Sequence, residues 1–124
     1  MPQPLPFGAA LTFQAGETLV DWALCGEIWM GPFNKVEGRP GHLAVTNQRV
    51  LFFAVRAPFQ GMFGGGTHEL VSSVDLGNVA AVTEGKYGMR DKIAVLDRSG
   101  NRRIYQYYGL KRLVPVIRQQ MAHQ

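Results

Sequence analysis

Short apolar runs rich in β-branched and aromatic residues alternate along the chain with breaks rich in glycine and proline. This pattern is typical of a mainly β protein with many tight connections. Seven runs fit strands, and they cover residues 18–30, 43–46, 49–56, 69–76, 78–84, 92–96 and 102–108. Gly26, inside the first run, is expected to mark a bulge or bend. Residues 31–41 hold three glycines and two prolines, which predict a turn-rich segment.

The last predicted element has a helical period, because its apolar side chains recur three and four residues apart. These are Leu110, Leu113, Val114, Ile117 and Met121. Proline is tolerated only near the start of a helix, so Pro115 indicates either a start near Arg112 or a distorted first turn. The predicted order is therefore seven strands followed by one amphipathic helix.

The length of 124 residues suits one domain with its own core, which we expect over residues 13–124. Prolines 2, 4 and 6 predict that residues 1–12 form a flexible, extended arm. No secretory signal pattern opens the chain, and no apolar run approaches the roughly 20 residues that span a bilayer. The single cysteine, Cys25, excludes an internal disulfide, is expected in the core, and fits a reducing cytoplasm.

Residues 41–55 predict two apolar strands joined by a tight turn at Thr46-Asn47-Gln48. Asn47 tolerates the left-handed conformation that such a turn needs. The sequence Gly-His-Leu-Ala-Val-Thr-Asn-Gln-Arg-Val-Leu-Phe-Phe resembles the core hairpin of the pleckstrin-homology-like (PH-like) superfamily, and within it the GRAM and bacterial PH-like branch. Two weaker landmarks follow the same order. Residues 13–17 are similar to the segment leading into the first strand, and residues 74–79 to the passage from strand four to strand five.

The resemblance covers about residues 13 to 121 and implies a fold. That fold is a partly open barrel of two nearly orthogonal antiparallel sheets, with seven strands in all and one C-terminal helix that closes a corner. The family is mostly a binding scaffold, so the resemblance implies a binding module without catalysis.

The residues themselves agree with that expectation, because no catalytic or metal-binding pattern is visible. His42, His68 and His123 are scattered, and none has a second ligand at metal spacing. No serine sits in a nucleophile-elbow pattern, and the glycine triplet 64–66 lacks the rest of a phosphate loop. We therefore predict no enzyme activity, no metal and no cofactor.

Thirteen Lys and Arg residues against nine Asp and Glu residues give a net charge of +4, which favours anionic partners. In the PH-like fold, the loops after strands one, three and six gather at the open end, opposite the helix. These loops and their flanks hold six candidate ligands for a lipid head group: Lys35, Arg39, Arg56, Arg98, Arg102 and Arg103. Glu37 and Asp97 lie among them and weaken their field. A solvated basic face is the alternative interpretation.

Phe59, Met62 and Phe63 are large apolar residues in one predicted loop, beside the glycine triplet. They would insert into a membrane next to the basic cluster, or contact a protein partner or a second copy of the chain. The third alternative is a small core under the loop.

Our preferred hypothesis is a peripheral module that binds anionic lipid through these loops, in the cytoplasm and at the inner face of the membrane. The alternative is a module for protein interaction or homo-oligomerisation through the same apolar loop or a sheet edge. A third, less favoured hypothesis is nucleic-acid binding, because Arg103, Tyr105 and Tyr107 share one predicted sheet face. That face would otherwise pack into the barrel.

Overall fold

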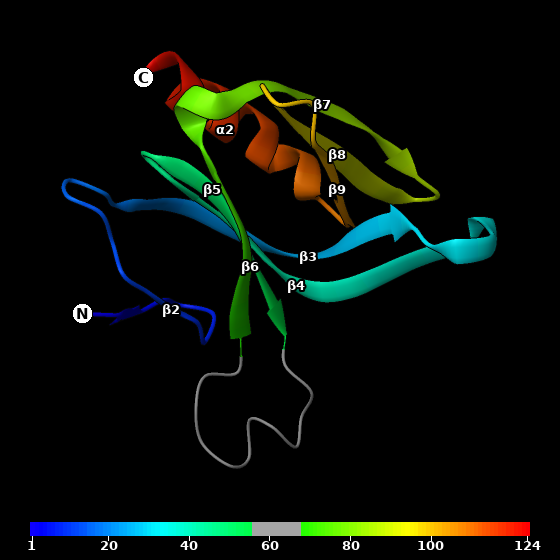
Figure 1. Ribbon diagram of the computed structural model, residues 1–124, viewed down its shortest axis with the longest axis horizontal. Coiled ribbons are helices and arrows are strands. Elements are labelled where there is room, and N and C mark those ends of the chain that lie inside the picture. The colour runs from blue at the N-terminus through cyan, green and yellow to red at the C-terminus, as the bar shows by residue number, and fades with distance from the viewer. Residues whose placement is uncertain (56–67) are drawn as a thin grey trace, which may run out of the picture.

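A computed structural model describes residues 1–55 and 68–124, and within them seven strands form one antiparallel sheet (Figure 1). The strand order across this sheet is β6-β5-β4-β3-β9-β8-β7. The strands are β3 (Leu19–Met30), β4 (Val36–Thr46), β5 (Arg49–Val55), β6 (His68–Asp75), β7 (Val79–Tyr87), β8 (Arg90–Asp97) and β9 (Arg102–Tyr107). The other elements are the strands β1 (Gln3–Pro4) and β2 (Ala10–Leu11), the 3₁₀ turns η1 (Pro32–Asn34), η2 (Leu76–Asn78) and η3 (Leu110–Arg112), and the helix α2 (Leu113–Ala122).

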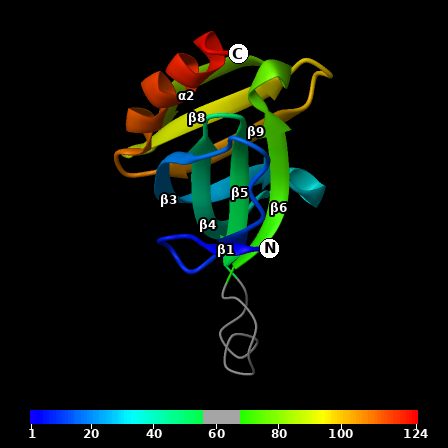
Figure 2. The same ribbon diagram turned by 90° about the vertical axis from the view of Figure 1, so that its left-hand side faces the viewer.

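The sheet bends at β3, the strand that joins its two halves. β3 pairs with β4 from Leu19 to Met30, but with β9 only over residues 26–28. The strands of the two halves consequently run in different directions, and α2 lies against the β7–β9 half (Figures 1 and 2). Pro115 is the third residue of α2, where a missing backbone N–H is tolerated, as the sequence predicts. No helix in the described ranges is long and apolar enough to cross a bilayer.

Seven strands and the closing helix lie where the pattern predicts them, but β4 is longer than expected. It starts at Val36, within a segment predicted as turns. Arg39 forms an ion pair with Glu27 across the strands, and a side chain at Gly38 would meet the Glu27 carbonyl at 2.9 Å. The ion pair, together with the close approach of the two strands that Gly38 permits, holds this turn-like sequence extended against β3. Of the bulge or bend expected at Gly26, no bulge forms there, because the register of β3 and β4 shifts between residues 19 and 21 instead.

The main core fills the space between the two halves of the sheet and the helix. Its largest fully buried side chains include Leu43, Phe52, Ile93, Leu113 and Ile117. A second cluster lies on the other face of β4 and β5, and its members are Ala44, Leu51 and Phe53 together with Leu5, Phe7, Ala9 and Leu11. Both faces of the central hairpin are therefore buried, which explains why residues 50–53 are continuously apolar.

The N-terminal segment differs from the extended arm expected from its prolines. β1 pairs with β2, and the Leu5 N–H donates to the Ala9 carbonyl at 2.7 Å. We call residues 3–11 the N-terminal hairpin. Its apolar residues alternate at positions 5, 7, 9 and 11, so they project together onto β4 and β5. Burial of this row outweighs the preference of the prolines for an exposed chain.

Candidate anion-binding site

A hollow of about 210 Å³ lies where the C-terminal end of β3 meets β4 and the start of β9. We call it the basic hollow, and its lining residues are Glu27, Ile28, Trp29, Arg39, Arg102 and Arg103. β3, β4 and β9 each contribute to it because β3 pairs with both neighbours around residue 27. The bend of the sheet therefore brings basic side chains together from strands that are far apart in sequence.

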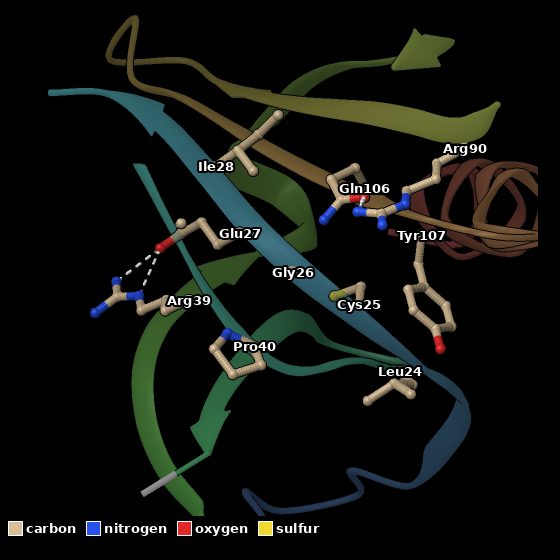
Figure 3. Close-up of a pocket in the computed structure, with 11 residues that line it drawn as sticks. Leu24, Cys25, Gly26, Glu27, Ile28, Arg39, Pro40, Arg90, Gln106 and Tyr107 are labelled. Carbon is tan, nitrogen blue, oxygen red and sulfur yellow. Dashed lines mark hydrogen bonds and ion pairs between the residues drawn. The ribbon is translucent and has the colours of Figure 1, made fainter. Parts of the chain in front are cut away.

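Glu27 is the central residue of the basic hollow. Its side chain is only 5% exposed, and its Oε1 accepts hydrogen bonds from Arg39 Nε at 2.9 Å and Nη2 at 2.7 Å (Figure 3). Its Oε2 accepts a longer bond from Arg103 Nη1 at 3.3 Å. The carboxylate fixes the positions of two guanidinium groups that are each more than one third exposed. Their free N–H groups remain able to bind an anion.

Aromatic rings also hold Arg39 in place. Its Cζ lies 5.4 Å from the centre of the Trp29 ring and 5.9 Å from that of Phe52. Such stacking orients a guanidinium without neutralising it. The Trp29 indole N–H donates to Glu37 at 3.2 Å, so a second carboxylate lies at the margin of the hollow.

The charges of the lining residues favour an anion. Three guanidinium groups and the Glu27 carboxylate leave a net charge of +2. Arg102 makes no ion pair with any residue in the ranges 1–55 and 68–124, and it is exposed. It is therefore the lining residue most available to a ligand.

A second hollow of about 350 Å³ adjoins the first and shares Glu27, Ile28 and Arg39 with it (Figure 3). Its surface includes the small residues Gly26, Gly38 and Pro40, and Arg90 donates to Gln106 at 3.1 Å beside it. Cys25 also borders it, but burial raises the pKa of that thiol to about 12. The cysteine is a core residue, as predicted, and remains a protonated thiol at neutral pH.

The six basic residues predicted as a cluster are only partly brought together. Arg39, Arg102 and Arg103 share the basic hollow, and Lys35 is exposed in the connection from β3 to β4. Arg98 lies elsewhere, because its Nε donates to the Gly77 carbonyl of η2 at 3.0 Å. Arg56 and the apolar residues Phe59, Met62 and Phe63 lie outside the described residues.

The central role of Glu27 was missed from the sequence. Its signal is an acidic residue at an inward-facing position of an apolar strand, two residues after Cys25. A buried carboxylate needs a cationic partner, so this position alone predicts a nearby arginine.

The connection between β3 and β4 exposes apolar groups close to the basic hollow. Phe33 is 99% exposed and Met30 is 62% exposed. Phe33 also has a φ of 62°, a left-handed conformation that is rare for a bulky side chain. We call residues 30–36 the β3–β4 tip. The ring adds little packing in solution while the backbone is strained, so the β3–β4 tip presents apolar groups to another surface.

The structure defines the surroundings of Tyr105 and of two histidines noted in the sequence. Tyr105 is buried and its ring packs 5.3 Å from that of Phe52, so it offers no surface for a nucleobase. His42 and His68, which look scattered in the sequence, lie side by side with ring nitrogens 2.9 Å apart. Within the described ranges, no three His, Cys, Asp or Glu side chains are grouped to hold a metal ion.

Comparison with solved structures identifies the architecture. The Vps36 N-terminal PH domain superimposes with a TM-score of 0.66 at 12% identity, over 98% of this chain and 91% of that domain. The C-terminal domain of an unknown protein from Leishmania infantum gives a TM-score of 0.62 at 16% identity, over 87% of each chain. The fold is PH-like. No protein-family model and no curated protein sequence matches the chain.

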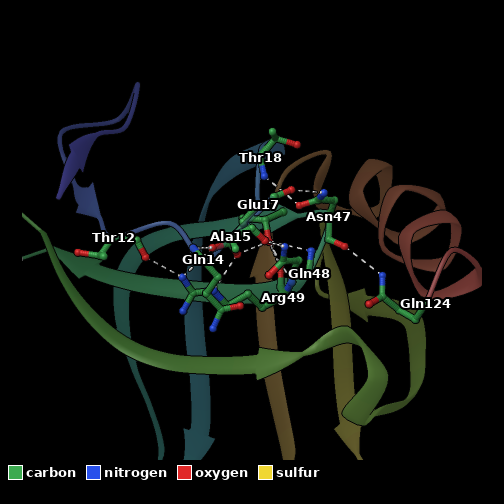
Figure 4. Close-up of polar contacts among 11 residues, drawn as sticks. Thr12, Gln14, Ala15, Glu17, Thr18, Asn47, Gln48, Arg49 and Gln124 are labelled. Carbon is green, nitrogen blue, oxygen red and sulfur yellow. Dashed lines mark hydrogen bonds and ion pairs between the residues drawn. The ribbon is translucent and has the colours of Figure 1, made fainter. Parts of the chain in front are cut away.

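In this PH-like fold, two of the sequence landmarks bind each other (Figure 4). Asn47 accepts the Thr18 N–H at 2.9 Å and donates to the Gly16 carbonyl at 2.9 Å. Gln48 donates to the Ala15 carbonyl at 2.7 Å. The landmark residues 13–17 and 46–49 therefore have a structural role, since they bind each other. The candidate binding site is the basic hollow, which none of them lines.

Proposed function

We propose that this protein is a non-catalytic PH-like module that binds anionic membrane lipid through the basic hollow and the β3–β4 tip. The strongest support for this proposal is that the β3–β4 tip and Arg39 of the basic hollow lie on one hairpin, formed by β3 and β4. Arg39 follows Val36 by three residues on β4, a separation of about 10 Å along a strand. The structural neighbours supply the fold alone, and function must come from the site itself.

Each part of this surface would meet a different layer of the membrane. Phosphate oxygens of a head group would bind Arg102 and the outward N–H groups of Arg39 and Arg103. Phe33 and Met30 would contact the boundary with the acyl chains, where burial of apolar groups adds to attraction by anionic lipid. Arg56, Phe59, Met62 and Phe63, which lie outside the described residues, remain part of this proposal as contacts predicted from the sequence. The proposal places the protein at the inner face of a membrane.

Co-sedimentation with vesicles tests this function. Phosphatidylcholine vesicles with and without phosphatidylserine would be compared at low and moderate salt. We expect binding only to the anionic vesicles and a steep loss with salt, because exposed charges are screened. The double substitution Arg102→Ala, Arg103→Ala should weaken binding by on the order of tenfold or more, since each basic residue near an anionic surface contributes about 1 kcal/mol.

A matched control removes two charges that do not line the basic hollow. Lys111→Ala, Arg112→Ala changes the net charge equally, in η3 immediately before α2. It should bind within about twofold of the unmodified protein if the basic hollow is the lipid site. Equal losses in both double variants would mean that only net charge matters. Absence of binding to any vesicle would exclude the proposal.

A protein partner or a second copy is the alternative, and one observation favours it. A shallow apolar hollow of about 200 Å³ lies beside the β3–β4 tip, lined among others by Met30, Val36, Tyr87 and Ile104. Apolar and aromatic residues of this kind form the centres of protein interfaces. Light scattering after gel filtration over a range of protein concentrations tests it. A mass that rises with concentration and falls for Tyr87→Ser would support this alternative.

A further inference from the structure

Two histidines from different strands meet beneath the N-terminal hairpin. His42 Nδ1 on β4 and His68 Nε2 on β6 lie 2.9 Å apart, within hydrogen-bonding distance. The Phe7 ring stacks on His42 with centroids 4.7 Å apart and meets His68 edge-on at 5.8 Å. Trp22 packs beside Phe7 with centroids 5.2 Å apart, and it lies 5.7 Å from His42. The hairpin therefore covers an imidazole pair with its own aromatic residue.

This arrangement favours neutral rings. Burial lowers the pKa of His42, and so does the neighbouring His68. Burial also lowers the pKa of His68, and a backbone hydrogen bond with Gly8 offsets part of that effect. A backbone group that raises a histidine pKa accepts a ring N–H, so the His68 ring donates to Gly8. Of the two facing ring nitrogens, one donates and the other accepts when both rings are neutral. A proton on the accepting nitrogen would leave two N–H donors facing each other.

The charged groups on the surrounding elements are bound elsewhere or exposed, as far as the described residues show. On β3, Asp21 accepts from Arg112 at 2.8 Å, and on β5, Arg49 is paired with Glu17. The other charged groups on these elements are Arg39, which is paired with Glu27, the exposed Glu37, Glu69 and Asp75, and the exposed Met1 ammonium. The carboxylates of Asp21, Glu17 and Glu27 are therefore each engaged by an arginine.

The pair also connects the hairpin to the sheet. Gly8 bonds to His68, and Phe7 stacks on His42. Around these contacts, Leu5 and Leu11 of the hairpin pack in one cluster with Leu51 and Phe53 of β5. Loss of the histidine contacts would weaken the docking of residues 3–11 and uncover this apolar face.

We propose that His42 and His68 act as a pH-sensitive latch that holds the N-terminal hairpin on β4 and β5 at neutral pH and releases it on acidification. The direction of the pH dependence follows from the lowered pKa values of the two histidines. The docked state excludes protons that the released state binds, so docking is strongest above the ordinary histidine value of 6.5 and weakens below it. Uptake of two protons would change the docking equilibrium by up to about 100-fold per pH unit. This proposal is independent of lipid binding.

Hydrogen exchange of the full chain, read by mass spectrometry at pH 7.5 and 5.5, tests the latch. After correction for the intrinsic pH dependence of exchange, peptides covering residues 1–12 should exchange at least about tenfold faster at pH 5.5. Peptides from β8 and β9 should not change. In the double substitution His42→Phe, His68→Phe, which keeps aromatic rings but binds no proton, this pH effect should disappear. His123→Gln, at the exposed end of the chain, is the control and should behave like the unmodified protein.

Two results would overturn the latch. One is equal protection of residues 1–12 at both pH values in the unmodified protein. The other is a pH effect that survives in the double phenylalanine variant. Should that variant fail to fold, NMR titration of the ring protons of the unmodified protein decides the question. His42 and His68 must then titrate below the ordinary histidine value of 6.5, and values at or above 6.5 would exclude the latch.

Discussion

The Glu17 carboxylate accepts two hydrogen bonds from the Arg49 guanidinium, at 2.7 Å from Nε and 2.9 Å from Nη2, across 32 residues of sequence. The Thr46 hydroxyl donates to the same carboxylate at 2.6 Å, and Arg49 also donates to the Thr12 carbonyl at 3.1 Å. The Glu17 side chain is fully buried. This pair joins the segment before β3 to the β4–β5 hairpin, and both residues belong to the landmark sequences.

Substitution of Arg49 should destabilise the fold strongly. Arg49→Met would leave the Glu17 carboxylate buried without a cation, which costs about 3–5 kcal/mol. Urea unfolding followed by tryptophan fluorescence measures the loss. Arg112→Met is the control, because Arg112 and Asp21 form a more exposed pair at 2.8 Å, worth about 1 kcal/mol or less. Similar losses in the two variants would show that the buried pair has no special role.

Stability should also depend on pH through Glu17. Burial raises the pKa of Glu17, but hydrogen bonds from Arg49, Thr46 and Gln14 outweigh it, so the pKa lies below the ordinary value of 4.5. A carboxyl group with a lowered pKa stabilises the fold above that ordinary value and loses its contribution as the pH falls through the folded value. Urea midpoints between pH 6 and 3 should therefore fall below about pH 4.5. Glu17→Gln should show a flatter profile in this window, and an unchanged profile would contradict the assignment.

Gly41 should tolerate no side chain. A Cβ there would collide with the Phe53 carbonyl and the Phe52 ring, both in the tightly packed centre of the sheet. Gly41→Ala should cost several kcal/mol or prevent folding, since neither neighbour can move freely. Gly85→Ala is the matched control within a strand, because its Cβ would lie 3.5 Å from the flexible Lys92 side chain. It should be neutral or slightly stabilising in thermal unfolding. Equal effects would argue against the packing around Gly41.

Local pattern was enough to predict the strands and the helix, because α2 buries one regular apolar stripe and β5, which is buried on both faces, is continuously apolar. It was less useful where long-range contacts decide the conformation. The start of β4 is extended because Arg39 pairs with Glu27 on the neighbouring strand, which no local signal shows. The N-terminal hairpin is a similar case. Its three prolines led to the prediction of an exposed arm, whereas its alternating apolar row packs on β5, about 40 residues away in the sequence.

The candidate site was predictable only in part for the same reason. Family resemblance placed Arg39, Arg102 and Arg103 at one end of the barrel, and the structure puts them in one hollow. It also grouped Arg98 with them, although that residue binds the Gly77 carbonyl of η2. The histidine pair depends on the register of β4 and β6 on either side of β5, and a one-residue error in register would move one ring to the opposite face.

Phe33 offers the last prediction, because it links backbone strain to binding. The ring is 99% exposed and the residue has a φ of 62°, so the side chain adds little packing while its backbone is unfavourable. Asparagine adopts this conformation readily, so Phe33→Asn should raise the free energy of unfolding by up to about 1 kcal/mol. The same variant should bind anionic vesicles more weakly, since the proposed apolar contact is lost.

Met89→Asn is the control for both measurements. Met89 is 89% exposed, lies between β7 and β8, and has no left-handed backbone to relieve. Its substitution should change stability by less than about 0.5 kcal/mol and leave vesicle binding unaltered. A Phe33→Asn variant that is less stable than the unmodified protein would mean that the ring packs in solution. A variant that gains stability and keeps full vesicle binding would remove the β3–β4 tip from the membrane surface, and the basic hollow would then have to bind lipid alone.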